Sequence, residues 1–141
     1  MPLSWIVYIL TALAALVVVL TRKRLGGDKE SAGRFQTSSS LLNVHTGAGA
    51  LAIILWVVFL VTGVGEGVGN AIVGIIALAL FWITVVAGLM ILVRWMPARG
   101  KHSSEAVHDT WSDGPGLSVL AHVGMLVGAC VFTWAYLTSA V

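Results

Sequence analysis

The amino-acid sequence predicts an all-α integral membrane protein, an up-down bundle of four helices with both chain termini on the outer, non-cytoplasmic side. Three observations predict this fold. The chain has 141 residues, of which 58% are hydrophobic and only 10% charged. Four long stretches contain no Lys, Arg, Asp or Glu, and all eight basic residues lie in two of the three segments that connect them. The composition excludes a soluble domain, since about a quarter of the residues in such domains are charged.

The four apolar stretches are expected to form a single transmembrane domain over residues 1–141. They cover residues 3–20, 41–63, 71–93 and 117–140. They are 18 to 24 residues long, and a helix needs about 20 residues to cross the hydrocarbon core. We expect the first stretch to be a retained span rather than a cleaved signal, because its basic residues, Arg22, Lys23 and Arg24, follow it instead of preceding it.

Turn and capping residues support the ends of the later helices. Residues 37–40, Thr-Ser-Ser-Ser, supply N-caps for the second helix, and Asn70 can cap the third. Pro97 is expected to end the third helix, and the Gly-Pro-Gly segment 114–116 leads into the fourth. The short segment 64–70 predicts a tight antiparallel hairpin between the second and third helices.

The connecting segments differ in charge. Segments 21–40 and 94–116 hold all eight basic residues, whereas the only charged residue in segment 64–70 is the acidic Glu66. Under the positive-inside rule, the two basic segments are loops that face the cytoplasm. We therefore expect a multi-pass protein of a bacterial plasma membrane, in which the first basic loop contacts anionic lipid headgroups.

Two histidines inside the spans are the main functional candidates, since an ionisable residue within the membrane is a functional hypothesis by default. His45 lies about four residues into the second helix and His122 about five residues into the fourth, roughly 6 and 7.5 Å deep at about 1.5 Å per residue. Both helices start from the cytoplasmic side, so we expect the two imidazoles at one level. A glycine follows each histidine at the second position, Gly47 in one case and Gly124 in the other.

This arrangement suits a b-type haem, with His45 and His122 as axial ligands and with Gly47 and Gly124 leaving clearance for the porphyrin ring. Two other interpretations stay open. The imidazoles can be a structural pair that hydrogen-bonds carbonyls, hydroxyls or water, or they can bind a quinone or relay protons. In every case both rings are expected to face the bundle interior, because lipid would leave their nitrogens without partners.

The loop 94–116 holds four polar residues at helical spacing, namely His102, Glu105, His108 and Asp109. Such a set can bind a divalent metal. Its spacing differs from that of structural zinc motifs, so we expect an interfacial helix or a docking surface for a partner subunit instead. The sequence contains no motif for nucleotide binding, nucleophilic catalysis or covalent haem attachment. No catalytic residue is therefore predicted, and an enzyme that acts on its own is not expected.

The span pattern, together with His45 and His122, resembles small membrane anchor or accessory subunits of respiratory electron-transfer complexes. Some of those subunits hold a b haem between histidines of neighbouring helices. The resemblance implies an accessory subunit of the respiratory chain that associates with other membrane subunits. The alternatives are a structural or assembly membrane protein with no redox cofactor, and a small membrane protein that handles quinone or lipid at the cytoplasmic leaflet. A nucleic-acid partner is not expected.

Overall fold

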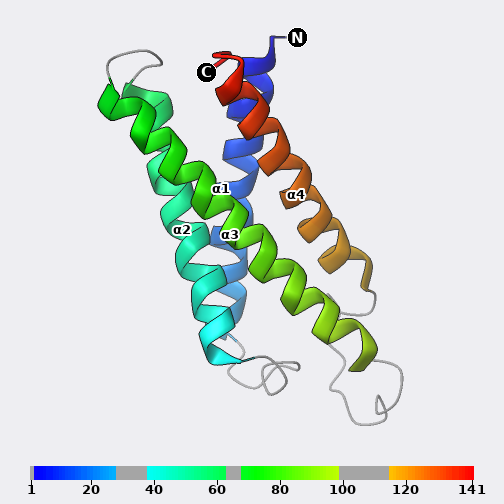
Figure 1. Cartoon of the computed structure of the whole chain (residues 1–141). Coiled ribbons are helices and arrows are strands. Elements are labelled where there is room, and N and C mark those ends of the chain that lie inside the picture. Colours follow the sequence, from blue (N-terminus) through cyan, green and yellow to red (C-terminus); the bar gives the residue numbers. More distant parts are fainter. Residues whose placement is uncertain (1, 28–37, 63–67, 99–114) are drawn as a thin grey trace.

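The computed structural model describes residues 2–27, 38–62, 68–98 and 115–141, and these residues form four α-helices (Figure 1). The helices are α1 (Leu3–Gly27), α2 (Ser39–Thr62), α3 (Val68–Ala98) and α4 (Pro115–Leu137). The predicted all-α fold is thus confirmed for the described residues. The two chain termini lie near each other at one end of the molecule (Figure 1).

Two helices extend beyond the apolar stretches that predict them. α1 continues through Arg22, Lys23 and Arg24, which are good helix formers, and ends at Gly27. α3 begins before Asn70, so Asn70 does not act as its cap. The Asn70 side chain instead accepts a hydrogen bond of 2.8 Å from the Thr62 hydroxyl, which joins the end of α2 to the start of α3.

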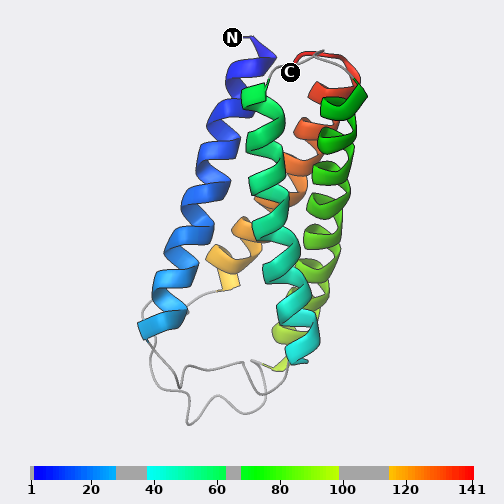
Figure 2. The ribbon, with the colours of Figure 1, turned by 90° about the vertical axis from the view of Figure 1, so that its left-hand side faces the viewer.

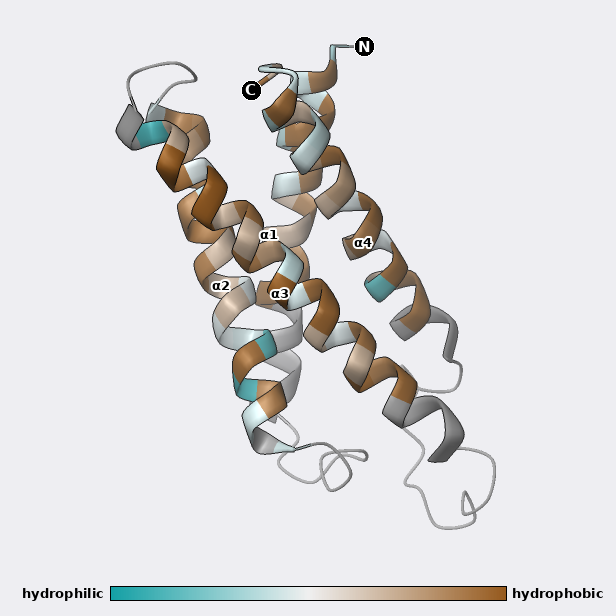
Figure 3. Cartoon of the chain, in the orientation of Figure 1, coloured by the Kyte–Doolittle hydropathy of each residue, from teal (hydrophilic) through white to brown (hydrophobic). Residues whose placement is uncertain are grey.

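Three of the helices are long and apolar enough to cross a membrane. The qualifying segments are Ser40–Thr62 in α2, Asn70–Val93 in α3 and Val119–Leu137 in α4. The apolar part of α1, Leu3–Val19, is shorter, so its role as a fourth span stays a prediction. Apolar residues predominate along the coloured parts of the helices in Figure 3, and many large ones are exposed to the surroundings. A membrane protein is the class that this surface supports, because lipid can cover it and water cannot.

The helices form a ring in which each packs against its neighbours in the chain, and α4 closes the ring against α1. α2 and α3 pack closely, whereas α1 makes fewer contacts with α2 and α4. Among the described residues, the diagonal backbones of α1 and α3, and those of α2 and α4, do not come together. Figure 2 shows α1 diverging from α2 toward the end of the bundle opposite the termini. The centre of that end is therefore not filled by backbone.

The hydrophobic core lies in the half of the bundle nearest the termini, which we call the terminal half. Its largest fully buried side chains include Trp56, Phe59, Phe81 and Phe132. The centroid of the Trp56 ring lies 5.1 Å from that of Phe59 and 5.0 Å from that of Phe132. The Trp56 indole N–H also donates a hydrogen bond of 3.2 Å to the hydroxyl of Thr11 in α1. Through the bond to Thr11, this aromatic cluster connects α1 to the other three helices.

Candidate functional site

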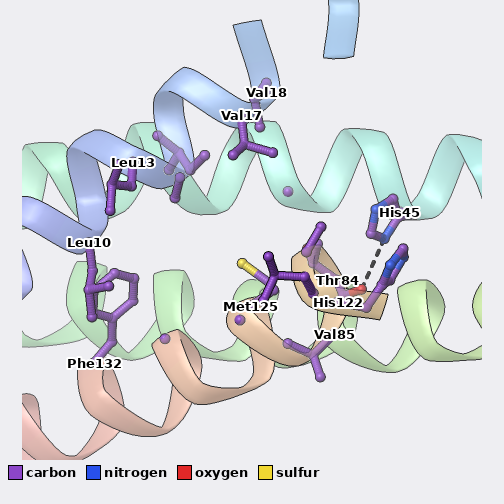
Figure 4. A pocket seen from close by; sticks show the side chains of 17 residues that line it. Leu10, Leu13, Val17, Val18, His45, Thr84, Val85, His122, Met125 and Phe132 are labelled. Carbon is purple, nitrogen blue, oxygen red and sulfur yellow. Dashed lines mark hydrogen bonds between the residues drawn. The ribbon is translucent and has the colours of Figure 1, made fainter. Parts of the chain in front are cut away.

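The two intramembrane histidines meet at the centre of the other half of the bundle, which we call the histidine half. His45 comes from α2 and His122 from α4, and their ring centroids are 6.1 Å apart with 24° between the ring planes. Both side chains are half-buried. The two histidines, which occupy similar positions along their helices, are thus also close to each other in space, and both rings lie inside the bundle (Figure 4).

The His45 ring is oriented by a backbone carbonyl of α3. Its Nδ1 lies 2.9 Å from the carbonyl oxygen of Thr84. A carbonyl oxygen only accepts hydrogen bonds, so Nδ1 carries the proton and donates it. In a neutral imidazole, the lone pair then remains on Nε2. The arrangement therefore gives His45 the tautomer that a metal ligand or a hydrogen-bond acceptor requires.

Gly88 of α3 borders both imidazoles. A Cβ at this position would lie 2.9 Å from Cε1 of His45 and 2.9 Å from Cδ2 of His122, distances that real Cβ atoms essentially never show. Any larger residue would have to push one of the rings away. Gly88 therefore permits both imidazoles to lie directly against α3.

An apolar cavity of about 410 Å³ opens beside the histidine pair. All four helices contribute to its wall, and α1 supplies Leu10, Leu13, Ala14, Val17 and Val18. Its polar side chains, His45, Thr84 and His122, gather at one end, and Leu10 and Phe132 lie at the other (Figure 4). Ligand sites in proteins are commonly apolar cavities of about 300 to 1,000 Å³ with a few convergent polar groups. The cavity has the properties of such a site.

The glycines near the histidines have different environments. Gly124 lines the cavity, as do Gly49 and Gly128, and a Cβ at Gly124 would meet nothing within 4 Å. Gly47 lies outside the cavity lining, and a Cβ there would likewise enter open space. On α2, the residue two positions after His45 points away from the cavity, whereas on α4 the corresponding residue, Gly124, borders the cavity together with His122. The glycine on the face of His45 is Gly49, four positions later.

Sequence reasoning did not assign Thr84 and Gly88 of α3 to the histidine site. A signal for Gly88 was present in the sequence. It lies about five residues before the C-terminal end of the third apolar stretch, and the histidines lie about as far from the N-terminal ends of their own stretches. Thr84 precedes it by one helical turn, so both belong to one face of α3.

The metal candidates of the loop 94–116, His102, Glu105, His108 and Asp109, lie outside the described residues. Within the described residues, no group of three or more His, Cys, Asp or Glu side chains is placed to hold a metal ion. The histidine pair is thus the principal chemical feature of the part of the chain that the structure describes.

Comparison with known proteins does not assign a function. No protein family, no curated protein and no solved structure matches the chain. The function therefore has to be argued from the histidine pair and its cavity.

Proposed function

We propose that the chain is an accessory integral-membrane subunit of a respiratory electron-transfer complex and binds one b-type haem between His45 and His122. The observation that carries the proposal is the separation of 6.1 Å between the two imidazole centroids beside an apolar cavity. Metal–imidazole bonds are about 2 Å long, so a metal held between two ring nitrogens separates the centroids by about 6 Å. The observed separation fits this arrangement.

The surroundings of the pair support haem as the group between the rings. Histidines that bind metals almost always donate their second ring N–H to a carbonyl or carboxylate, and His45 has such a bond to Thr84. The apolar side chains and Gly124 offer a macrocycle a water-poor environment. A macrocycle centred between the imidazoles also needs room on the side of α3, so haem binding has to widen the gap at Gly88. When bound, haem supplies an iron centre that accepts and releases one electron.

The test is the visible spectrum of the purified protein, produced in cells supplied with haem. We expect a reduced-minus-oxidised spectrum of low-spin haem with two imidazole ligands. His45→Ala and His122→Ala should each abolish this spectrum, because each removes one axial ligand. The matched control is the double variant His102→Ala/His108→Ala, which removes two histidines from the loop 94–116 and should leave the spectrum unchanged. A wild-type protein without haem, or a His45→Ala variant with the parental spectrum, refutes the proposal.

The proposal includes a membrane topology. Four spans place both termini outside the bacterial plasma membrane and both basic loops in the cytoplasm, and the position of the eight basic residues supports this orientation. The histidine pair then lies near the cytoplasmic side. A reporter that is active only in the periplasm should be active when it is fused after Val141, and a cytoplasmic C-terminus would refute the topology.

The loop 94–116 is proposed as a docking surface for another membrane subunit.

A second candidate is a small membrane protein that binds a quinone or lipid at the cytoplasmic leaflet. It is favoured by the position of the polar side chains at one end of an otherwise apolar cavity, since such ligands have one polar end and an apolar chain. Extraction of a quinone from protein that lacks haem would support it. A third candidate, a structural or assembly protein without a cofactor, is favoured by the His45–Thr84 hydrogen bond, which joins α2 directly to α3.

A further inference from the structure

The carbonyl that orients His45 belongs to a residue whose own side chain is fixed. Thr84 is buried, and its hydroxyl donates a hydrogen bond of 2.8 Å to the carbonyl of Leu80, one turn earlier in α3. A threonine side chain has few rotamers in a helix, and this bond selects one of them. The Thr84 methyl group, Cγ2, is thereby held against α2.

The residue that receives this methyl group is Gly49, which follows His45 by one turn of α2. Gly49 is buried, and a Cβ at this position would lie 3.2 Å from Thr84 Cγ2 and 3.6 Å from Thr84 Oγ1. The first distance is tighter than most real Cβ contacts. Because residues four apart share a helix face, the contact between Gly49 and Thr84 controls the spacing of α2 and α3 where His45 meets the Thr84 carbonyl.

We infer that Gly49 is a positioning residue for His45: its missing side chain lets Thr84 approach α2, and the Thr84 carbonyl then fixes the proton of His45 on Nδ1 and leaves Nε2 to bind a ligand. The role of Nε2 as a haem ligand rests on the proposed function. The position of the ring proton does not, since it follows from the hydrogen bond of 2.9 Å. α3 thus tunes the site although it contributes neither imidazole.

The first test compares substitutions at Gly49 with the same substitutions at Gly47, which is on the same helix and whose Cβ would meet nothing within 4 Å. Gly49→Ala and Gly49→Val should separate α2 from α3 progressively and weaken the His45 bond. Loss of such a bond typically lowers metal affinity by about 10- to 100-fold. We expect a loss in this range for Gly49→Val, a smaller loss for Gly49→Ala, and a higher midpoint potential in both, because the imidazole becomes a weaker electron donor. Gly47→Ala and Gly47→Val should match the wild type.

A rescue variant separates positioning from general damage. Thr84→Ser removes the Cγ2 methyl group but keeps the hydroxyl and the backbone carbonyl. In the Gly49→Ala background it should restore haem affinity and midpoint potential toward the wild-type values, because it removes the closest clash. A Gly49→Ala defect that Thr84→Ser leaves unchanged, or equal effects at Gly47 and Gly49, would overturn the inference.

A third measurement does not depend on haem. ¹⁵N NMR of haem-free protein labelled at histidine, with the His45 signals assigned from the His45→Ala variant, reports which ring nitrogen carries the proton. We expect Nδ1 of His45 to be protonated in the wild type and in Gly47→Val, and a mixture of both tautomers in Gly49→Val. If the wild type binds no haem but shows this difference, the proposed function fails and the positioning role of Gly49 stands. If the His45 tautomer is the same in all variants, the positioning role is refuted whether or not haem binds.

Discussion

The terminal half and the histidine half of the bundle are built by the same four helices but are filled differently. In the terminal half, the Trp56 side chain is 0% exposed and its ring is surrounded by those of Phe59, Phe81 and Phe132. In the histidine half, the helices enclose a cavity of about 410 Å³ beside His45 and its partner imidazole. The difference shows that one half is closely packed while the other encloses an apolar cavity.

Side-chain size explains the contrast. Gly74, in the terminal half, is covered by large rings, and a Cβ there would lie 2.7 Å from the Tyr136 ring and 3.0 Å from that of Phe59. Gly124 and Gly128, which line the cavity, have nothing within 4 Å of the same position. Lipid does not drive helices together as water does, so close packing has to stabilise the bundle. Most of that packing is in the terminal half.

The largest difference in stability between the halves is expected when a core residue and a cavity-lining residue are each truncated to alanine and the two variants are compared. Trp56→Ala should lower the free energy of unfolding by about 3 to 5 kcal/mol, because it leaves a large void in a packed cluster. Leu13→Ala should lower it by about 1 kcal/mol or less, since Leu13 is half exposed and borders an existing cavity. Unfolding by a denaturing detergent in mixed micelles measures both. Equal losses would show that the histidine half is packed as tightly as the terminal half.

A smaller difference in stability is expected when one methyl group is added to each half. Gly74→Ala should destabilise the protein by about 1 to 3 kcal/mol, because Tyr136 and Phe59 would have to move. Gly128→Ala adds its methyl group to open space and gains up to about 1 kcal/mol of helix propensity. The same unfolding measurement compares them. A destabilised Gly128→Ala would indicate that the cavity is closed in the membrane.

The attachment of α1 to the terminal half depends in part on one buried hydrogen bond. Thr11→Val keeps the shape of the side chain but leaves the Trp56 indole N–H without its acceptor, which should cost about 1 to 2 kcal/mol. Thr11→Ser keeps the hydroxyl and is the matched control. A Thr11→Val protein as stable as Thr11→Ser would mean that aromatic packing alone holds α1.

The sequence was sufficient to predict the helices and to bring the two histidines to a similar position along α2 and α4, where their rings lie 6.1 Å apart. Long stretches without charge predict apolar helices, and counting residues from one side of the membrane predicts that His45 and His122 lie at the same level. Depth along a helix does not specify which face points inward. That is why the clearance expected at Gly47 lies away from the cavity, while Gly49, on the face of His45, contacts Thr84.

Other features depend on how helices pack and could not be predicted from spacing along one helix. The hydrogen bond between His45 and the Thr84 carbonyl requires the register of α2 against α3. The cavity depends on the position of α1, which lines it and diverges from α2 toward the end opposite the termini (Figure 2). The direction of α1 depends on side chains from all four helices, and no single segment of the sequence specifies it.

The smallest effect on stability, combined with a clear effect on binding, is expected when the cavity is filled. Gly124→Leu places a side chain where a Cβ meets nothing within 4 Å and where the residue lines the cavity. The free energy of unfolding should change by about 0.5 kcal/mol or less, as for substitutions away from packed features. Haem affinity should fall by at least about tenfold, or about 1.4 kcal/mol, because the side chain occupies the space of the ligand.

Gly47→Leu is the control for this variant, because Gly47 also faces open space but does not line the cavity. Unfolding in detergent and titration with haem, measured on both variants, separate stability from binding. If Gly124→Leu and Gly47→Leu bind haem equally well, the ligand does not occupy the cavity. If Gly124→Leu instead loses as much stability as Gly74→Ala, the histidine half contributes to stability through packing like the terminal half. The open cavity would then not be a property of the protein in its membrane.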